Sequence, residues 1–309
     1  MVAEGERQGA GRRSMLVPTA LLTTSGIVYG GIFTANKIAI GAGFPFAAYT
    51  FWQTFLAGAV LLVFSLAQGQ LPGLGFVHVR HYVLTSSLGI VMPLLVLTYV
   101  ADRLPAGVLT LIFALAAPLA YIFAFALGRE RFQWLSVAGV AFGFAGILMI
   151  VVPEGTLPVV GAAAWMVFAL AVPVMLATNN MVMAYLRPPA TSTLALVSGL
   201  QLAAAAITFP VMIATGGFYP FWTAPDPALW ALAWAAAAQA ITFLAVLEVV
   251  RRAGPVYTSQ INYVIVVAGF LWALALFDEG LSGWVWGALG VMLAGLALAH
   301  SGAARRPTV

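Results

Sequence analysis

The fold of this chain is decided by two stretches that match each other: residues 103–132, RLPAGVLTLIFALAAPLAYIFAFALGRERF, and residues 252–281, RAGPVYTSQINYVIVVAGFLWALALFDEGL. A shift of 149 positions aligns them without a gap, and the register continues into the next glycines. The aligned pairs are Arg103 with Arg252, Thr110 with Ser259, Ala124 with Ala273, Ala126 with Ala275, Leu127 with Leu276, Glu130 with Glu279, and Ala145-Gly146 with Ala294-Gly295. An arginine, a hydroxyl, a glutamate and a glycine in one register indicate an internal repeat.

Around these stretches the composition is that of a membrane protein. Of the 309 residues, 63% are hydrophobic and 7% are charged, whereas ordinary soluble domains are about 25% charged. The mean hydropathy is +1.03, and apolar runs recur along the whole length. We therefore predict an all-α polytopic membrane protein that has no soluble domain of any size.

Glycine, proline and charge clusters divide the chain into ten predicted spans, because a helix needs about 20 residues to cross the hydrocarbon core. An open sheet would leave backbone donors unpaired in lipid, and the alternation of a β-barrel is not seen. The three histidines, His78, His81 and His300, are predicted at span edges. The predicted spans are residues 16–38, 46–67, 82–101, 105–127, 132–152, 159–186, 191–215, 228–250, 255–277 and 282–300.

The basic residues predict the orientation. With both termini in the cytoplasm, eleven of the 13 basic residues lie inside, Arg103 lies outside and Lys37 lies in the membrane. This bias satisfies the positive-inside rule and favours the inner membrane of a bacterial cell. Residues 1–15 are predicted to be a cytoplasmic tail rather than a cleaved signal, and residues 301–309 a second cytoplasmic tail.

The repeat predicts two halves, residues 16–152 and residues 159–300, of five helices each. Five is an odd number, so the halves must cross the membrane in opposite senses. An inverted repeat of this kind suits alternating access, because two equivalent halves can rock about a site near the midplane.

The GRERF segment at residues 128–132, its FDEGL counterpart at residues 277–281 and the glycine-rich fifth and tenth helices resemble the EamA branch of the drug/metabolite transporter superfamily. Within that branch the aromatic, sparsely charged helices are most similar to YddG-type exporters of aromatic and other amino acids. The resemblance covers essentially the whole chain after the tail. It implies two EamA repeats and a central cavity formed mainly by helices 1, 3, 4, 6, 8 and 9, with helices 5 and 10 peripheral or at an interface.

Polar and aromatic side chains deep in the spans are the candidates for a binding site, since each is costly in lipid unless it faces a cavity or another helix. Helical spacing places those of helices 1 and 6 on one face of each helix. Helix 9 carries Asn262 in the same polar stretch as two of the candidates. The predicted substrate-binding residues are Tyr29, Asn36, Met92, Tyr99, Trp165, Phe168, Met175, Asn179, Gln239, Gln260 and Tyr263.

This lining is aromatic and amide-rich and carries no fixed charge, which suits a small amphipathic zwitterion. We predict export of aromatic and other neutral amino acids by alternating access around Gln239. A phosphate ester would require an arginine or lysine at the midplane, and Lys37 is near an outer end. Glu248, beside Arg251 and Arg252, lies at the cytoplasmic end of its span, which argues against proton coupling through a central carboxylate.

Each candidate has a structural alternative. Gln239 could serve interhelical packing, Tyr29, Trp165 and Tyr99 could fill cores or interface belts, and Asn36 and Asn179 could cap helices. Three mid-span prolines are predicted hinges, with static kinks as the alternative: Pro93, Pro118 and Pro173. Several glycines predict close helix contact within the monomer or at a dimer seam: Gly139, Gly143, Gly146, Gly287 and Gly290.

Other function classes find less support. The chain has no cysteine, which excludes disulfides and thiol chemistry, and it shows no zincin motif, no nucleophile elbow and no acidic pair at mid-membrane. We predict that it is not an enzyme and uses no cofactor or metal. The predicted partners are amino acids and the lipid bilayer, not nucleic acid, in a monomer or weak homodimer. A passive channel, a lipid-handling protein and a transporter of other metabolites or drugs remain alternatives.

Overall fold

The protein is all-helical in a computed structural model that describes residues 2–129, 132–151, 162–186, 188, 192–277 and 282–304. No strand occurs in those ranges. Several predicted features fall outside the described residues or side chains. They are the repeat partners Glu130 and Glu279, the basic residues Arg131, Arg187, Arg305 and Arg306, the side chains of Arg7, Arg12, Arg13 and His300, and the ends of both predicted tails.

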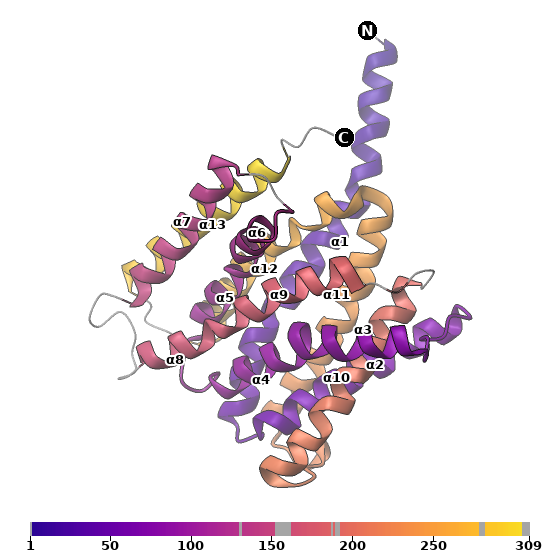
Figure 1. The fold of residues 1–309 in the computed structure, drawn as a ribbon, viewed down its shortest axis with the longest axis vertical. Helices are drawn as coiled ribbons and strands as arrows, with labels where there is room; N and C mark the ends of the chain where they lie inside the picture. The colour runs from indigo at the N-terminus through magenta and orange to yellow at the C-terminus, as the bar shows by residue number, and fades with distance from the viewer. Residues whose placement is uncertain are drawn as a thin grey trace.

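The helices of the first half follow the predicted order. Their bounds are α1 Val2–Gly41, α2 Phe46–Ala67, α3 Phe76–Ser86, the π-helix η1 Ser87–Val91, α4 Met92–Tyr99, α5 Ala106–Ala114, α6 Ala116–Ala126 and α7 Trp134–Val151. The first turns of α1 extend beyond the bundle in Figure 1.

The second half of the chain also consists of helices. Its helices are α8 Ala162–Ala169, α9 Ala171–Leu186, α10 Thr193–Gly216, the short 3-10 helix η2 Phe221–Thr223, α11 Asp226–Thr258, α12 Ile261–Leu276 and α13 Gly283–Ala304. A kink divides α11 at Gly254, whose φ of +82° favours glycine. That kink separates the predicted eighth and ninth spans.

Among the residues that the structure describes, seven helical segments are long and apolar enough to cross a membrane. They are Met15–Gly41, Phe46–Ala67, Phe76–Tyr99, Ala106–Ala126, Ala163–Met183, Thr193–Gly216 and Asp226–Gly254. Three shorter apolar helices, Trp134–Ile150, Ile261–Leu276 and Gly283–Leu298, lie where the other predicted spans were placed. Large apolar side chains such as Val63, Leu148 and Leu271 are exposed on these helices, as expected where lipid is the solvent.

All three mid-span prolines coincide with interruptions of a helix. Pro118 and Pro173 each lie four residues after a helix end, Ala114 of α5 and Ala169 of α8. Pro93 is the second residue of α4, which begins where the π-helix η1 ends. Proline has no N–H and its ring clashes with the carbonyl four residues earlier, which explains each break. The breaks are in the structure, while hinge motion at them stays a prediction.

One boundary prediction is wrong and affects a titratable residue. The third span was predicted to begin at residue 82, but α3 begins at Phe76. His81 was therefore placed at a span edge, whereas it lies inside α3 with an exposed fraction of 0%. The sequence misled because His78, Arg80 and His81 look like a polar loop, although the chain is helical through them.

Helices of the two predicted halves pack against each other. The most extensive contacts are between α7 and α13, between α1 and α11, between α2 and α10, and between α1 and α12. Further contacts join α9 to α4 and α6, and α5 to α12. In Figure 1 the pair α7 and α13 lies at one edge of the bundle, while α2 and α10 lie together on another side.

Small residues allow α7 and α13 to approach closely. A side chain at Gly295 would meet the backbone oxygen of Gly139 at 2.8 Å, and one at Gly146 would meet the side chain of Met292 at 2.3 Å. Gly287 similarly faces Met149. Close contact within the monomer is therefore confirmed for these glycines, whereas Gly290 has open space around it.

Candidate functional site

A cavity of about 180 Å³ lies among α5, α6, α9 and α12. Two carboxamides, Asn180 of α9 and Asn262 of α12, line it together with apolar residues. Asn180 is exposed and Asn262 half-buried, so both side chains are accessible. The apolar lining residues are Phe113, Ala114, Ala116, Ala117, Leu176 and Val266.

The break between α5 and α6 borders this cavity. Because Pro118 has no N–H, the carbonyl of Ala114 loses the donor that it would have in a continuous helix. Ala114 itself lines the cavity. Discontinuous helices in membrane transporters use such freed carbonyls to hold cations.

Phe113, one of the residues that line the cavity, also belongs to an aromatic pair. Phe113 packs edge-on against Phe33 of α1, with ring centroids 5.5 Å apart. Phe33 is almost fully buried, with 2% exposure. This pair joins α1 to α5 beside the cavity.

A cluster that we call the Arg103 clasp joins the end of α4 to α8. The Arg103 guanidinium lies 4.4 Å from the ring centre of Tyr99 and 4.5 Å from that of Trp165. Tyr99 also contacts Trp165 at 6.0 Å, Phe168 at 6.2 Å and Phe46 at 5.2 Å between ring centroids. Asp102 lies 3.6 Å from the same guanidinium. Three predicted site residues thus meet, around an arginine that was not predicted to join them.

Gln239, the predicted centre of the site, is 5% exposed and contacts another amide. Gln53 of α2 donates from its Nε2 to the Gln239 Oε1 at 2.9 Å. Both amides lie between α2 and α11, and neither lines the described cavity. The sequence analysis did not single out Gln53, although a glutamine in the middle of an apolar helix is a signal for a buried partner.

The other predicted residues spread over several surfaces. Asn36 and Asn179 are buried, and Asn179 packs against Gly89 of η1. The Tyr263 hydroxyl donates to the carbonyl of Leu296 on α13 at 2.6 Å, and Gln260 is exposed in the turn before α12. The remaining three are the partly buried Tyr29 and Met175 and the exposed Met92.

Asn180 was missed because the helical phase changes. The predicted face of helix 6 ran through Trp165 and Phe168 to Asn179 as one continuous helix. The break at Leu170 between α8 and α9 interrupts that phase, so extrapolation across it selected the neighbouring asparagine. Pro173 was the signal for the shift.

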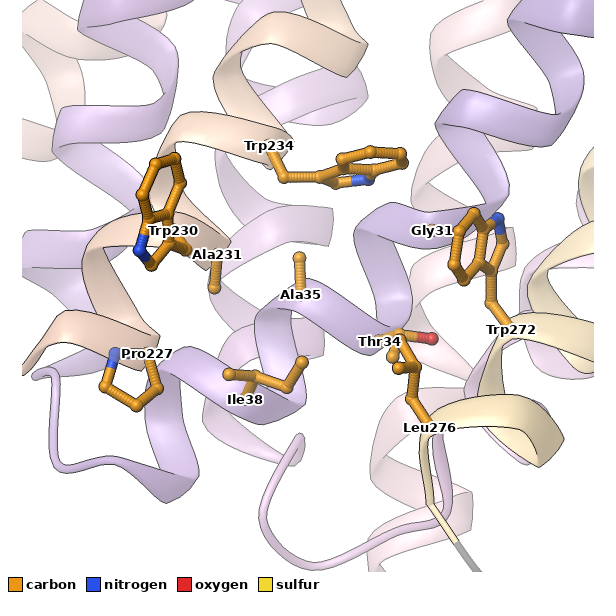
Figure 2. A pocket seen from close by; sticks show the side chains of 10 residues that line it. All are labelled: Gly31, Thr34, Ala35, Ile38, Pro227, Trp230, Ala231, Trp234, Trp272 and Leu276. Carbon is orange, nitrogen blue, oxygen red and sulfur yellow. The ribbon is translucent and has the colours of Figure 1, made fainter.

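A second, larger cavity of about 330 Å³ lies between α1, α11 and α12. Figure 2 shows its three indole rings, Trp230 and Trp234 from α11 and Trp272 from α12, around Ala35 and Ile38. Trp230 is 77% exposed. This groove is on the side of α11 opposite Gln239, since nine residues separate Trp230 from Gln239 and each residue turns a helix by about 100°. It therefore opens away from the Gln53–Gln239 pair.

Charged groups are at the ends of the spans. Arg251 donates from Nε to Glu248 Oε2 at 2.8 Å and from its terminal nitrogen to Oε1 at 2.6 Å, and Arg252 also donates to Glu248. The Lys37 ammonium lies 4.7 Å from the ring centre of Phe277. In the described part of the chain, no group of three metal-ligating side chains comes together.

The described architecture is therefore an apolar helical bundle with a small amide-lined cavity. Comparison with models of known protein families finds a match. The model of the EamA-like transporter family matches residues 18–152. The match covers the first part of the chain and less than half of its length.

Structural comparison agrees with that fold. In all, 15 solved chains match. One of them, described as a crystal structure of a protein, superposes with a TM-score of 0.63 at 20% identity, covering 94% of this chain and 99% of that chain. At that identity the likeness concerns the fold alone. Comparison of the sequence with curated proteins found no match.

Proposed function

We propose that this EamA-domain protein transports small amphipathic metabolites, neutral amino acids above all, through the cavity among α5, α6, α9 and α12. The observation that carries this proposal is the pair of accessible carboxamides, Asn180 and Asn262, facing an apolar wall. Carboxamides offer both donors and acceptors, so they suit a substrate that bears a carboxylate and an ammonium together.

The size of the cavity favours a small solute. Pockets for drug-sized ligands begin at roughly 300 Å³, and this one holds about 180 Å³. The freed carbonyl of Ala114 is an acceptor for an ammonium group, and Phe113 and Leu176 offer an apolar surface for a side chain. We propose aromatic amino acids as part of the range because the Arg103 clasp presents further rings along the path.

Packing supports ten spans in two inverted halves. The predicted repeat relates α1 to α8 and α9, α2 to α10, α3 and α4 to α11, α5 and α6 to α12, and α7 to α13. Three of the contacts join such counterparts directly: α2 with α10, α7 with α13, and α5 with α12. The contacts of α1 with α11 and α12 have their counterparts in those of α9 with α4 and α6. Such mutual pairing is what a two-fold axis in the membrane plane produces.

Alternating access follows from this arrangement as the proposed mechanism. We propose that the Arg103 clasp and the Phe33–Phe113 pair close the cavity toward the end of the bundle that carries the 100–105 turn, and the aromatic contacts within each support this role. With the predicted orientation that end faces outward. Rocking of one half against the other would break these aromatic contacts and expose the cavity on the outer side.

Counterflow in proteoliposomes tests the function. Vesicles loaded with unlabelled phenylalanine should accelerate uptake of labelled phenylalanine, and uptake should saturate, because a carrier returns faster when loaded. Linear, non-saturating flux would instead indicate a passive channel. Lipid transfer without amino-acid flux would indicate a lipid-handling protein, and either result would contradict the proposal.

A further inference from the structure

A third cavity, of about 400 Å³, lies between α2, η2 and the start of α11. The structure describes the whole of the chain that builds it, residues 42–67 and 216–250. Asp226 and Phe221 line the cavity where the helices end, and Trp230, Leu232 and Leu56 line it further in. Pockets for drug-sized ligands begin at roughly 300 Å³, so this cavity is large enough for a ligand of that size.

One tryptophan fixes the η2 wall of this cavity to α2. Trp52 donates from its Nε1 to the carbonyl of Tyr219 at 2.8 Å. Its ring packs edge-on against that of Phe221, with centroids 4.9 Å apart. Because Phe221 lines the cavity, this wall is in place before any ligand binds.

Trp230 gives the cavity a large and accessible aromatic surface. Its side chain is 77% exposed, and it lines both this cavity and the groove of the three indoles. Figure 2 shows its ring standing apart from those of Trp234 and Trp272. The face of an indole is the aromatic surface that attracts an ammonium group most strongly.

Among the described residues that line the cavity, Asp226 alone is charged, and its side chain is exposed. The neighbouring stretches 42–67 and 216–225 contain no Asp, Glu, Lys, Arg or His. The bases of α11, Arg251 and Arg252, are near its other end and bond to Glu248. A carboxylate beside an indole face attracts a cation and repels an anion.

The lining changes from polar to apolar along the helices. Asp226 is the first residue of its span, and Ala233, which also lines the cavity, lies about 10 Å deeper at 1.5 Å per residue. Leu56 is close to the middle of α2. A bilayer lipid has the same order, with its head group at the interface and its acyl chains below. A small soluble ammonium compound would leave the deeper apolar part uncovered.

We propose that this cavity binds a phospholipid that has an ammonium head group, such as phosphatidylethanolamine, from the leaflet in which α11 begins. The ammonium group lies between the Asp226 carboxylate and the face of Trp230, and an acyl chain covers the apolar residues below. A lipid without an ammonium group, such as phosphatidylglycerol, brings its negative phosphate to the carboxylate with no compensating cation. This lipid site is separate from the proposed substrate cavity and does not depend on the transport function.

Native mass spectrometry of the whole protein tests the site with phosphatidylethanolamine and phosphatidylglycerol of identical acyl chains. Wild-type protein should retain the ethanolamine lipid about fivefold or more over the glycerol lipid. Asp226→Asn should remove this preference, and Asp226→Glu should keep it. Trp230→Leu should weaken retention of the ethanolamine lipid, whereas Trp284→Leu, which removes a 53% exposed indole at the start of α13, should not. Equal retention of both lipids by wild type, or an unchanged preference in Asp226→Asn, would overturn the proposal.

Thermal unfolding separates lipid binding from a purely structural role of Asp226. A ligand that binds only the folded protein stabilises it, so phosphatidylethanolamine should raise the unfolding temperature of wild type more than phosphatidylglycerol does. In Asp226→Asn the two lipids should give equal shifts. An acid in the first turn also stabilises a helix through its dipole. A lower unfolding temperature with the lipid difference intact would therefore assign Asp226 to the helix end alone and contradict the site.

Discussion

At the scale of single residues, Asn180 and Asn262 carry the proposed binding chemistry. Replacing either with alanine removes a hydrogen bond to a charged group, which is worth about 1.5–3 kcal/mol. We expect KM for a transported amino acid to rise about tenfold or more, as measured by saturable uptake. Thr178→Val is the control on α9, because the Thr178 hydroxyl donates to Val174 of its own helix at 2.8 Å. Equal KM values for Asn180→Ala and the control would remove the cavity from the mechanism.

Gln53 and Gln239 make a contrasting prediction, because their bond holds α2 to α11. Interhelical hydrogen bonds in membranes are worth about 0.6 kcal/mol on average, and an unpaired buried amide costs about 1–3 kcal/mol. Gln239→Ala should therefore lower the thermal unfolding temperature and leave KM unchanged. The Gln53→Leu, Gln239→Leu double variant should recover much of the loss. A rise in KM at unchanged stability would instead return Gln239 to the substrate site.

The sequence does not show which way a side chain points from its helix, and this limited the prediction of individual site residues. Sequence shows that Gln239 lies at mid-span, but its direction depends on the partner helix, and that partner, Gln53, is 186 positions away. Trp165 and Phe168, which local spacing placed on one face of a single helix, do come together, and both contact Tyr99. Their assembly needed only that two helix ends meet at the same side of the membrane.

At the scale of helices, the Arg103 clasp should control how often α4 and α8 separate. Each cation–π contact is worth about 0.5–1 kcal/mol at an exposed site, so losing two should shift the open population about 5- to 30-fold. The cysteine-free chain allows a single reporter at Ala164→Cys on α8. Its labelling by a charged maleimide should quicken in Arg103→Gln and stay unchanged in the control Arg80→Gln. Identical labelling rates in the two variants would show that the clasp does not hold the end closed.

The contact of α7 with α13 gives a test of helix packing with a control on the same helix. A methyl group at Gly295 would lie 2.8 Å from the Gly139 oxygen and 2.8 Å from the Phe142 Cβ, whereas Gly290 has nothing within 4 Å. Gly295→Ala should cost about 1–3 kcal/mol of stability by overpacking. Gly290→Ala should stay within about 0.5 kcal/mol of wild type. Thermal unfolding in detergent measures both, and equal unfolding temperatures would contradict the packing described.

The sequence predicted which segments form helices. It predicted only in part where those helices are interrupted. Hydropathy and the roughly 20-residue span length located the apolar segments, and proline located the breaks. The start of α3 was missed because hydropathy scores His78, Arg80 and His81 as a loop. In the structure His81 is covered by the helices around α3, and that coverage is a tertiary property.

For the whole molecule, an even number of spans predicts that both chain ends lie on the same side. Single cysteines added at each end of the cysteine-free chain should be labelled by a membrane-impermeant reagent only in opened cells. The physical reason for this orientation is the excess of basic residues at the predicted cytoplasmic ends of the spans, according to the positive-inside rule. Labelling of one end in intact cells would mean an odd number of spans, and the inverted halves would then be wrong.

The pairing of α7 with α13 also bears on how the polypeptide matures. Its closest helix contacts join segments whose synthesis is separated by more than a hundred residues, and α1 likewise packs on α11 and α12. A ribosome that has released α7 into the bilayer has not yet made the helix that covers its glycines. The first half must therefore remain loosely packed until the last helix has been synthesised. A chain truncated before α13 should be a substrate for membrane quality-control proteases.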